Sequence, residues 1–373
     1  MNRLSTPLKS GSEAQLRASR GRRVAQLLAG SWKASPSFST VSPPELEELT
    51  PLLLRSGTGG LAWCRVRQAV ASLSPALPPL QQAYRFQSLE AALHEYRLKQ
   101  VIPHLRSAGV EPVLVKGWAI ARLYPEPGMR PFSDLDLCVL PEQYRAASAA
   151  LASPESPAGN VDLHLGFGKF GERRADDIFA RSHLVRLDDL EVRVLSAEDH
   201  LHFLCLHLLR HGAVRPLWLC DIALMLEARA KDFDWQRCLG PARQQADWVA
   251  CTIGLAHQLL GAEVDGTPIA RRAKKLPNWL VPAVLKAWGT PFQSLGQLAV
   301  YLRHPVNQLT ELLSVLPHHW PNPIEATMTL KGSFNELPRW PFQIGHVFSR
   351  AAALLAQLSG YPQRYPGPVQ PRS

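Results

Sequence analysis

Two short stretches that alternate strictly between polar and apolar residues limit what this chain can fold into. They are residues 133–140 (SDLDLCVL) and 160–167 (NVDLHLGF). A period of two is typical of a β-strand with one face on the core, because successive side chains point to opposite faces. The fold must therefore contain a sheet whose other face carries acidic side chains.

Neighbouring segments predict further strands and, outside them, helices. The run 110–116 (VEPVLVK) is rich in β-branched residues, and 183–194 contains two short alternating runs around an Asp-Asp turn. We predict an α+β protein, with a small mixed sheet flanked by N- and C-terminal helical segments. The predicted parts are a disordered basic arm (1–40), an N-terminal helical region (41–109), the αβ core (110–195), a C-terminal helical region (196–358) and a Pro-rich tail (359–373).

The longest predicted helix covers about residues 80–108 and has apolar residues at three- and four-residue spacings. This spacing places them on one side of the helix, and we expect that side to face the core. The stripe consists of Phe86, Leu89, Leu93, Tyr96, Val101 and Leu105.

The positive charge of the chain is concentrated near its beginning. The 373 residues carry a net charge of +10, and residues 1–36 contain seven basic residues against one acidic residue. The remaining net charge of +4 does not indicate a surface for duplex DNA. We therefore predict a disordered basic arm, although an Arg- and Ser-rich, acid-poor start also fits a targeting segment.

Hydropathy and cysteine spacing predict the environment of the protein. No uncharged apolar run approaches the roughly 18–20 residues needed to span a bilayer, so we expect no membrane partner. The six cysteines include no C-x-x-C pair, which argues against a disulfide framework or a cysteine-based zinc site. We expect a soluble protein in the reducing cytoplasm.

Acidic residues on the two alternating strands predict a metal site. Asp134 and Asp136 share one face of the first strand, and Asp162 shares a face of the second with His164. If the strands are neighbours, three carboxylates can hold two Mg²⁺ ions about 3.5–4 Å apart, which suits phosphoryl displacement. The alternative is a half-exposed strand face that is acidic without binding metal.

Residues before the first alternating strand are candidates for nucleotide binding. Gly117 can bring the backbone close to a phosphate, and Lys116 and Arg130 can add positive charge to a triphosphate. Both cations could instead form ordinary ion pairs with the aspartates. Ser133 either contributes a hydroxyl near the metals or caps the start of the strand.

Several of these segments together resemble a known family. The runs 114–124 (LVKGWAIARLY) and 130–137 (RPFSDLDL), with 161–164 (VDLH), 199–211 (DHLHFLCLHLLRH) and 217–223 (LWLCDIA), resemble a bacterial family of uncharacterised nucleotidyltransferases. This family lies in the DNA polymerase beta-like nucleotidyltransferase superfamily. The resemblance extends over most of the chain, but its specific motifs are confined to these runs.

The resemblance implies an enzyme that uses Mg²⁺, with Mn²⁺ as a substitute. It implies transfer of a nucleoside monophosphate from an NTP, with ATP expected, to a hydroxyl acceptor, with release of pyrophosphate. Asp134 and Asp136 would be the first two metal carboxylates, and Asp162 the third, which polarises the attacking hydroxyl. A small molecule or peptide acceptor is favoured over RNA. The turn Lys116-Gly117-Trp118 departs from the Gly-Ser or Gly-Gly usual in the superfamily.

A helix with three histidines leaves a second interpretation open. His200, His207 and His211 share one face of a predicted helix, and Asp221 lies on the next helix. Core packing or lining of the nucleotide cleft is the interpretation we favour for these residues. A phosphohydrolase centred on His207, His211 and Asp221 is the alternative, as is a non-catalytic nucleotide-binding protein on the same scaffold.

Overall fold

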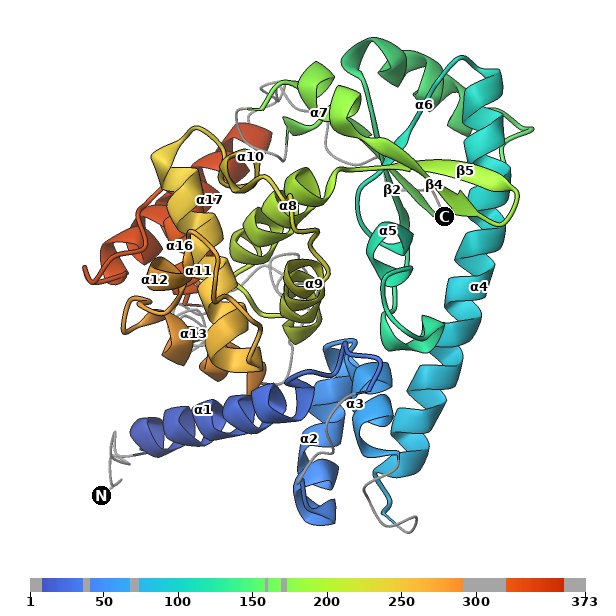
Figure 1. Cartoon of the computed structure of the whole chain (residues 1–373). Coiled ribbons are helices and arrows are strands. Elements are labelled where there is room, and N and C mark those ends of the chain that lie inside the picture. Colours follow the sequence, from blue (N-terminus) through green and yellow to red (C-terminus); the bar gives the residue numbers. More distant parts are fainter. Residues whose placement is uncertain are drawn as a thin grey trace.

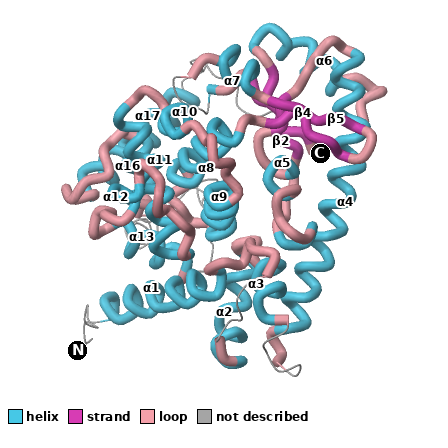
Figure 2. Tube along the Cα trace, in the orientation of Figure 1, coloured by secondary structure: helices cyan, strands magenta, loops and turns pink. Residues whose placement is uncertain are grey.

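The computed structural model describes residues 9–35, 41–67, 74–157, 160–168, 173–290 and 320–358. A small sheet lies at one end of the molecule, and helices from both sides of the sequence surround it (Figures 1 and 2). This arrangement confirms the predicted α+β class with helical segments before and after the sheet. No helix within these residues combines the length and apolarity needed to cross a membrane.

The sheet has five strands in the order β3-β2-β1-β5-β4 and is mixed. β1 (Val113–Leu114) pairs antiparallel with β2 (Leu135–Val139) and parallel with β5 (Leu190–Val194). β3 (Val161–Leu165) runs parallel to β2 at one edge, and β4 (His183–Leu187) forms a hairpin with β5 at the other. The two alternating segments are therefore adjacent strands.

The helices fall into three groups along the chain. Those before the sheet are α1 (Lys9–Leu28), α2 (Pro43–Arg55), α3 (Gly59–Val66) and α4 (Leu77–Ser107). Short helices between the strands are α5 (Trp118–Ala121), η1 (Pro127–Met129), η2 (Pro141–Gln143), α6 (Tyr144–Ala152) and α7 (Ala175–Arg181). After the sheet come α8 (Ala197–Arg210), α9 (Pro216–Glu227), α10 (Trp235–Leu239), α11 (Arg243–Leu260), α12 (Ala270–Ala273), α13 (Leu280–Trp288), α16 (Pro323–Thr329) and α17 (Trp340–Leu358).

Two hydrophobic clusters hold the sheet between the helical groups. The apolar face of β2, which carries Leu135, Leu137 and Val139, packs with the second half of α4 and with α6. Cys138, on the opposite face, belongs to the larger cluster that includes α8 and α9. The acidic face of β2 is therefore partly covered by the C-terminal helices rather than open to solvent. All six cysteines are buried thiols without a disulfide.

The prediction of a disordered arm over residues 1–40 is wrong for residues 9–35. This segment forms α1 and a following turn, and Trp32 donates its indole N–H to Glu227 of α9 at 3.0 Å. Four side chains of α1 are buried in the larger core: Val24, Ala25, Leu27 and Leu28. These apolar residues lie at the end of a basic segment. The prediction of disorder used the composition of the whole segment, which did not reveal this short apolar stretch. The rest of the arm and the tail at 359–373 lie outside the described residues.

Two glycines allow α1 to cross α13 at very short range. A Cβ atom on Gly21 would lie 1.9 Å from the carbonyl oxygen of Leu285. A Cβ atom on Gly289 would lie 1.8 Å from the carbonyl oxygen of Arg17. Because both obstacles are backbone atoms, no side-chain rotation can relieve either clash. The first helix is thus held against the C-terminal helical region by direct backbone contact.

Replacing Gly289 with alanine is expected to destabilise the protein by about 1–3 kcal/mol, because the added methyl group must push α1 away from α13. Urea unfolding measures the effect. Gly168→Ala is the matched control, since a Cβ atom there would meet no atom within 4 Å. Equal unfolding midpoints for both variants would contradict the close contact between the two helices.

The apolar stripe predicted on the long helix is only partly buried. α4 runs along one side of the molecule (Figure 1), and Val101 and Leu105 are in the core as predicted. The first four members of the stripe are exposed: Phe86, Leu89, Leu93 and Tyr96. The first half of α4 packs instead through residues outside the stripe, among them Leu80, Gln87 and Ala91. A Cβ atom on Gly128 of η1 would lie 2.4 Å from the hydroxyl oxygen of Ser88. Such close contact needs no large apolar side chain at this point. The spacing of apolar residues therefore predicted the wrong buried face for the first half of α4.

Candidate metal and nucleotide site

Strand register brings two of the three predicted carboxylates together. β2 and β3 are parallel neighbours, and Asp136 lies directly opposite Asp162. His164 lies two residues further along β3 and so shares a face with Asp162. The adjacency of the strands, which the alternation alone could not establish, therefore creates a cluster of three polar side chains on one face of the sheet.

The three side chains are close enough to bind one ion. His164 Nε2 lies 3.2 Å from Asp136 Oδ1 and 3.2 Å from Asp162 Oδ2. One ligand atom from each residue lies within 4.8 Å of the others, and the described residues contain no second such group of His, Cys, Asp or Glu. Asp136 is buried, whereas Asp162 and His164 are half-buried, so the cluster is reached from the β3 side.

Lys116 completes the charge balance around the buried aspartate. Its Nζ atom lies 2.5 Å from Asp136 Oδ1, and the N–H of the preceding Val115 donates to the carbonyl of Asp136 at 3.1 Å. Burial alone would raise the pKa of Asp136. The hydrogen bond with His164 and the charge of Lys116 outweigh this effect and hold that pKa below its usual range. Asp136 is therefore ionised at neutral pH.

Gly117 allows the chain to turn sharply beside the aspartates. Its backbone has φ 55° and ψ −119°, a conformation that only glycine adopts without strain. A Cβ atom there would also lie 3.2 Å from the carbonyl oxygen of Asp134 and 3.4 Å from Phe132. The conformation explains why the residue after Lys116 is a glycine, and it places this turn against the segment that leads into β2.

Asp134 lies just before β2 and is half-buried, outside the group of three closely spaced ligands. Burial raises the pKa of Asp134, and the negative charge of Asp136 raises it further, while Lys116 opposes both effects. The two carboxylates therefore repel each other in the metal-free protein. This donor set, with hard oxygen atoms under mutual repulsion, fits Mg²⁺ or Mn²⁺, and the imidazole of His164 suits Mn²⁺ better than Mg²⁺.

Arg130 and Asp221, both predicted to lie near the nucleotide, form a buried ion pair with each other. Arg130 Nη2 donates to Asp221 Oδ2 at 2.9 Å, and Nε donates to Oδ1 at 3.2 Å. The hydroxyl of Tyr124 donates to the same Oδ1 at 2.8 Å. Arg130 Nη1 also donates to the carbonyl of Gly117 at 3.4 Å, so the pair links α9 to the turn beside the aspartates. A direct contact between Arg130 and nucleotide stays a prediction.

The remaining predicted residues lie around this centre. Ser133 is exposed, and its carbonyl accepts a hydrogen bond from the side-chain amide of Asn160 at 3.0 Å. His207 and His211 pack against the ring of Trp218, with ring centroids 4.5 and 5.3 Å away. Neither histidine belongs to a group of metal-ligating side chains in the described residues, nor does Asp221.

His200 and Arg215 show two further roles for the helical region. Burial lowers the pKa of His200 to about 3, so its ring is neutral where α8 packs on the sheet.

Arg215, which sequence reasoning missed, lies at the start of α9 over the ring of Trp218, 5.1 Å from the centroid. It is close enough for its charge to interact with Asp134. Nothing in the sequence around this arginine, which precedes a proline, predicts that it lies near Asp134.

Comparison with known proteins agrees with this geometry. A family model described as uncharacterised nucleotidyltransferase matches residues 42–154 and 159–261, which together make up more than half of the chain. The chain therefore belongs to this nucleotidyltransferase family. The match contains the whole sheet, α8 and α9, and so every residue of the site described above. No curated protein and no solved structure matches the chain.

Proposed function

We propose that this protein transfers a nucleoside monophosphate from an NTP to a hydroxyl acceptor. The observation that carries the proposal is the Asp136–Asp162–His164 cluster in a chain of a nucleotidyltransferase family. The acceptor oxygen would bond to the α-phosphorus while the bond to the β-phosphate oxygen breaks, and pyrophosphate would leave. ATP is the expected nucleotide, and the acceptor is unidentified.

The three aspartates would hold Mg²⁺, with Mn²⁺ as a substitute. When bound, the metal offsets the negative charge of the triphosphate and of the transferred phosphorus. Asp134 and Asp136 would be its main ligands. Asp162, half-buried and opposite Asp136, would accept the proton of the acceptor hydroxyl. His164 would position both Asp136 and Asp162, since its ring nitrogen lies 3.2 Å from each.

Cations around the cluster would position the triphosphate. Lys116 now pairs with Asp136 and can exchange that partner for a phosphate oxygen once a metal neutralises the carboxylate. Gly117 permits close approach of the backbone to a phosphate. Arg215 would act from the helical side. Arg130, bound to Asp221, would mainly position the Gly117 turn, and Ser133 could add a hydroxyl at the exposed edge.

The family resemblance favours a small acceptor. We therefore favour a small molecule or a peptide over RNA, in the cytoplasm.

A second candidate function is nucleotide binding without turnover. The observation in its favour is the Lys116–Asp136 ion pair, because an ammonium group at 2.5 Å already neutralises the carboxylate that a metal would need. In that case the protein would bind NTP with little dependence on Mg²⁺. The phosphohydrolase alternative gains no such support, because Asp221 is fully engaged by Arg130 and Tyr124.

Labelled nucleotides distinguish these functions. The protein is incubated with a cell extract and with NTP labelled on either the α- or the γ-phosphate, with and without Mg²⁺. Nucleotidyl transfer is expected to place the α-label on a product and the γ-label in pyrophosphate, only with Mg²⁺. A γ-labelled product, or release of free nucleotide alone, would contradict the proposal. Metal-independent binding without any product would favour the second candidate.

A further inference from the structure

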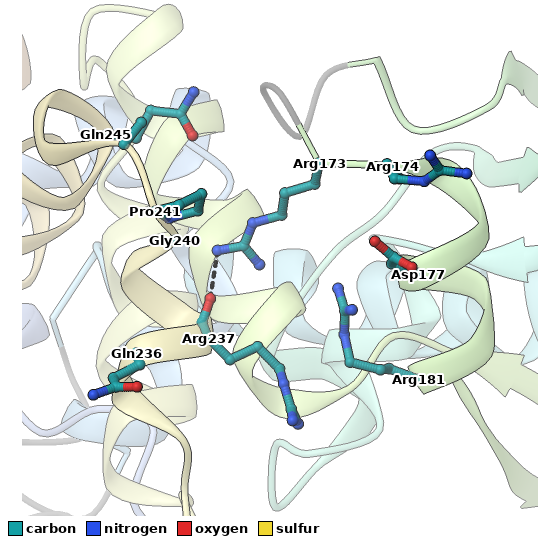
Figure 3. A pocket seen from close by; sticks show the side chains of 10 residues that line it. Arg173, Arg174, Asp177, Arg181, Gln236, Arg237, Gly240, Pro241 and Gln245 are labelled. Carbon is teal, nitrogen blue, oxygen red and sulfur yellow. Dashed lines mark hydrogen bonds between the residues drawn. The ribbon is translucent and has the colours of Figure 1, made fainter.

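A second polar site lies where α7 approaches α10 (Figure 3). It is a pocket with a volume of about 280 Å³, and none of the residues that line it belongs to the carboxylate site. Four of its ten lining residues are arginines, and one is acidic. The arginines are Arg173, Arg174, Arg181 and Arg237, and the acidic residue is Asp177.

Two arginines at the base of the pocket share one buried carboxylate. Arg181 donates to Asp199 through Nε at 2.9 Å and Nη2 at 3.1 Å, and Arg173 also bonds this carboxylate. Asp199 is fully buried. Burial would raise its pKa, but Arg181 and Arg173 outweigh burial and lower it, so the carboxylate is ionised. The four lining arginines thus stand against two carboxylates, the buried Asp199 and the lining Asp177.

The base of the pocket is fixed by backbone contacts. Arg173, whose side chain is only 8% exposed, donates to the carbonyl oxygens of Arg237 at 2.5 Å and Cys238 at 2.9 Å. Its guanidinium lies against Gly240, where a Cβ atom would come within 3.2 Å of Nη2. The arginine is thus held in place before any ligand arrives, which lowers the entropic cost of binding.

The two outer arginines are held only loosely. Arg174 and Arg237 have side chains that are 76% and 43% exposed, and their partners Asp176 and Asp234 lie 3.4 Å away. Exposed ion pairs of this length contribute little and are easily exchanged. Glu198, a further nearby acid, accepts the backbone N–H of Asp234. The outer guanidinium groups can therefore turn toward a ligand.

We propose that this pocket binds a small phosphate-bearing anion, such as a phosphate monoester or a diphosphate. Guanidinium groups match phosphate oxygens in pairs, and a phosphate has more acceptor oxygens than a carboxylate to satisfy several arginines. The two outer arginines would supply the main donors, while Arg173 and Arg181, which already donate to Asp199, add positive charge beside the cavity. The site is separate from the metal centre, and the proposal does not rest on the proposed function.

Calorimetric titration of the full chain with pyrophosphate in EDTA tests the proposal. EDTA removes divalent cations, so phosphate held through a metal at the carboxylate site does not contribute. We expect saturable one-to-one binding that weakens as salt increases. Citrate, which has a similar charge but only carboxylates, is expected to bind more weakly. Absence of pyrophosphate binding at low salt, or equal affinity for citrate, would overturn the proposal.

Paired variants locate the binding. Arg174→Gln with Arg237→Gln is expected to weaken pyrophosphate binding at least about tenfold, because two charge-assisted contacts are lost. The control is Arg145→Gln with Arg186→Gln, which makes the same charge change at exposed positions outside the pocket. Equal weakening in both double variants would mean general charge attraction and overturn the proposal. If the first variant melts early, Arg174→Gln alone, at the more exposed position, gives the same comparison.

Discussion

Replacing Asp136 with asparagine is expected to lower nucleotidyl transfer by about a thousandfold. Asp136 is the central carboxylate of the cluster, contacted by both Lys116 and His164, and an amide oxygen is a poor ligand for a hard cation. The effect is measured as the rate at which α-label enters the product at saturating Mg²⁺. The substitution also leaves Lys116 without its buried partner, so we expect a lower free energy of unfolding as well.

Asp162→Asn separates chemistry from stability. Asp162 has a side chain that is 34% exposed, and so its loss should change the free energy of unfolding by less than about 1 kcal/mol. We nevertheless expect a loss of transfer comparable to that of Asp136→Asn. Asp189→Asn removes the same charge at an exposed turn and should leave the rate unchanged. Full transfer activity in Asp162→Asn would be inconsistent with its proposed role.

Replacing Asp221 with alanine is expected to reduce the free energy of unfolding by about 3–5 kcal/mol, because Arg130 would be left as an unpaired buried charge. The side chains of both residues are almost completely buried, at 6% and 0% exposure, and Tyr124 would lose its acceptor as well. Chemical denaturation, monitored by tryptophan fluorescence, measures the change.

A double variant shows whether the cost comes from the unpaired charge. Arg130→Met with Asp221→Leu should recover most of the lost stability, since an apolar pair can replace a buried ion pair. We expect transfer to stay impaired in this variant, because Arg130 no longer holds the carbonyl of Gly117. A double variant less stable than Asp221→Ala would show that the ion pair itself, rather than the unpaired charge, dominates.

The sequence predicts those features of the fold that depend on local patterns. Alternation in 133–140 and 160–167 identified β2 and β3 and assigned Asp136 and Asp162 to polar faces, because the period of a strand fixes which side chains share a face. The α+β class followed from the order of strand-like and helical segments. The family resemblance rested on the same short motifs, which lie inside the matched region.

Other features depend on contacts between distant segments, which no local pattern encodes. Arg130 and Asp221 are 91 positions apart, and neither shows from its neighbours that the other is its partner. The first half of α4 is buried through Leu80, Gln87 and Ala91, whereas the predicted stripe of large apolar side chains lies on its exposed face. The arginine pocket draws on segments that begin at Arg173 and Gln236, and only the fold brings them together.

Binding of Mn²⁺ to the metal-free protein tests the central claim most directly. Electron paramagnetic resonance of free Mn²⁺ gives the affinity without any assumption about the acceptor or the nucleotide. We predict saturable binding by the unmodified protein and by Asp189→Asn, and an affinity about 10–100-fold weaker in Asp162→Asn, as expected for loss of a carboxylate from a metal site. Equal Mn²⁺ affinity in all three proteins would contradict a metal centre at Asp134, Asp136 and Asp162.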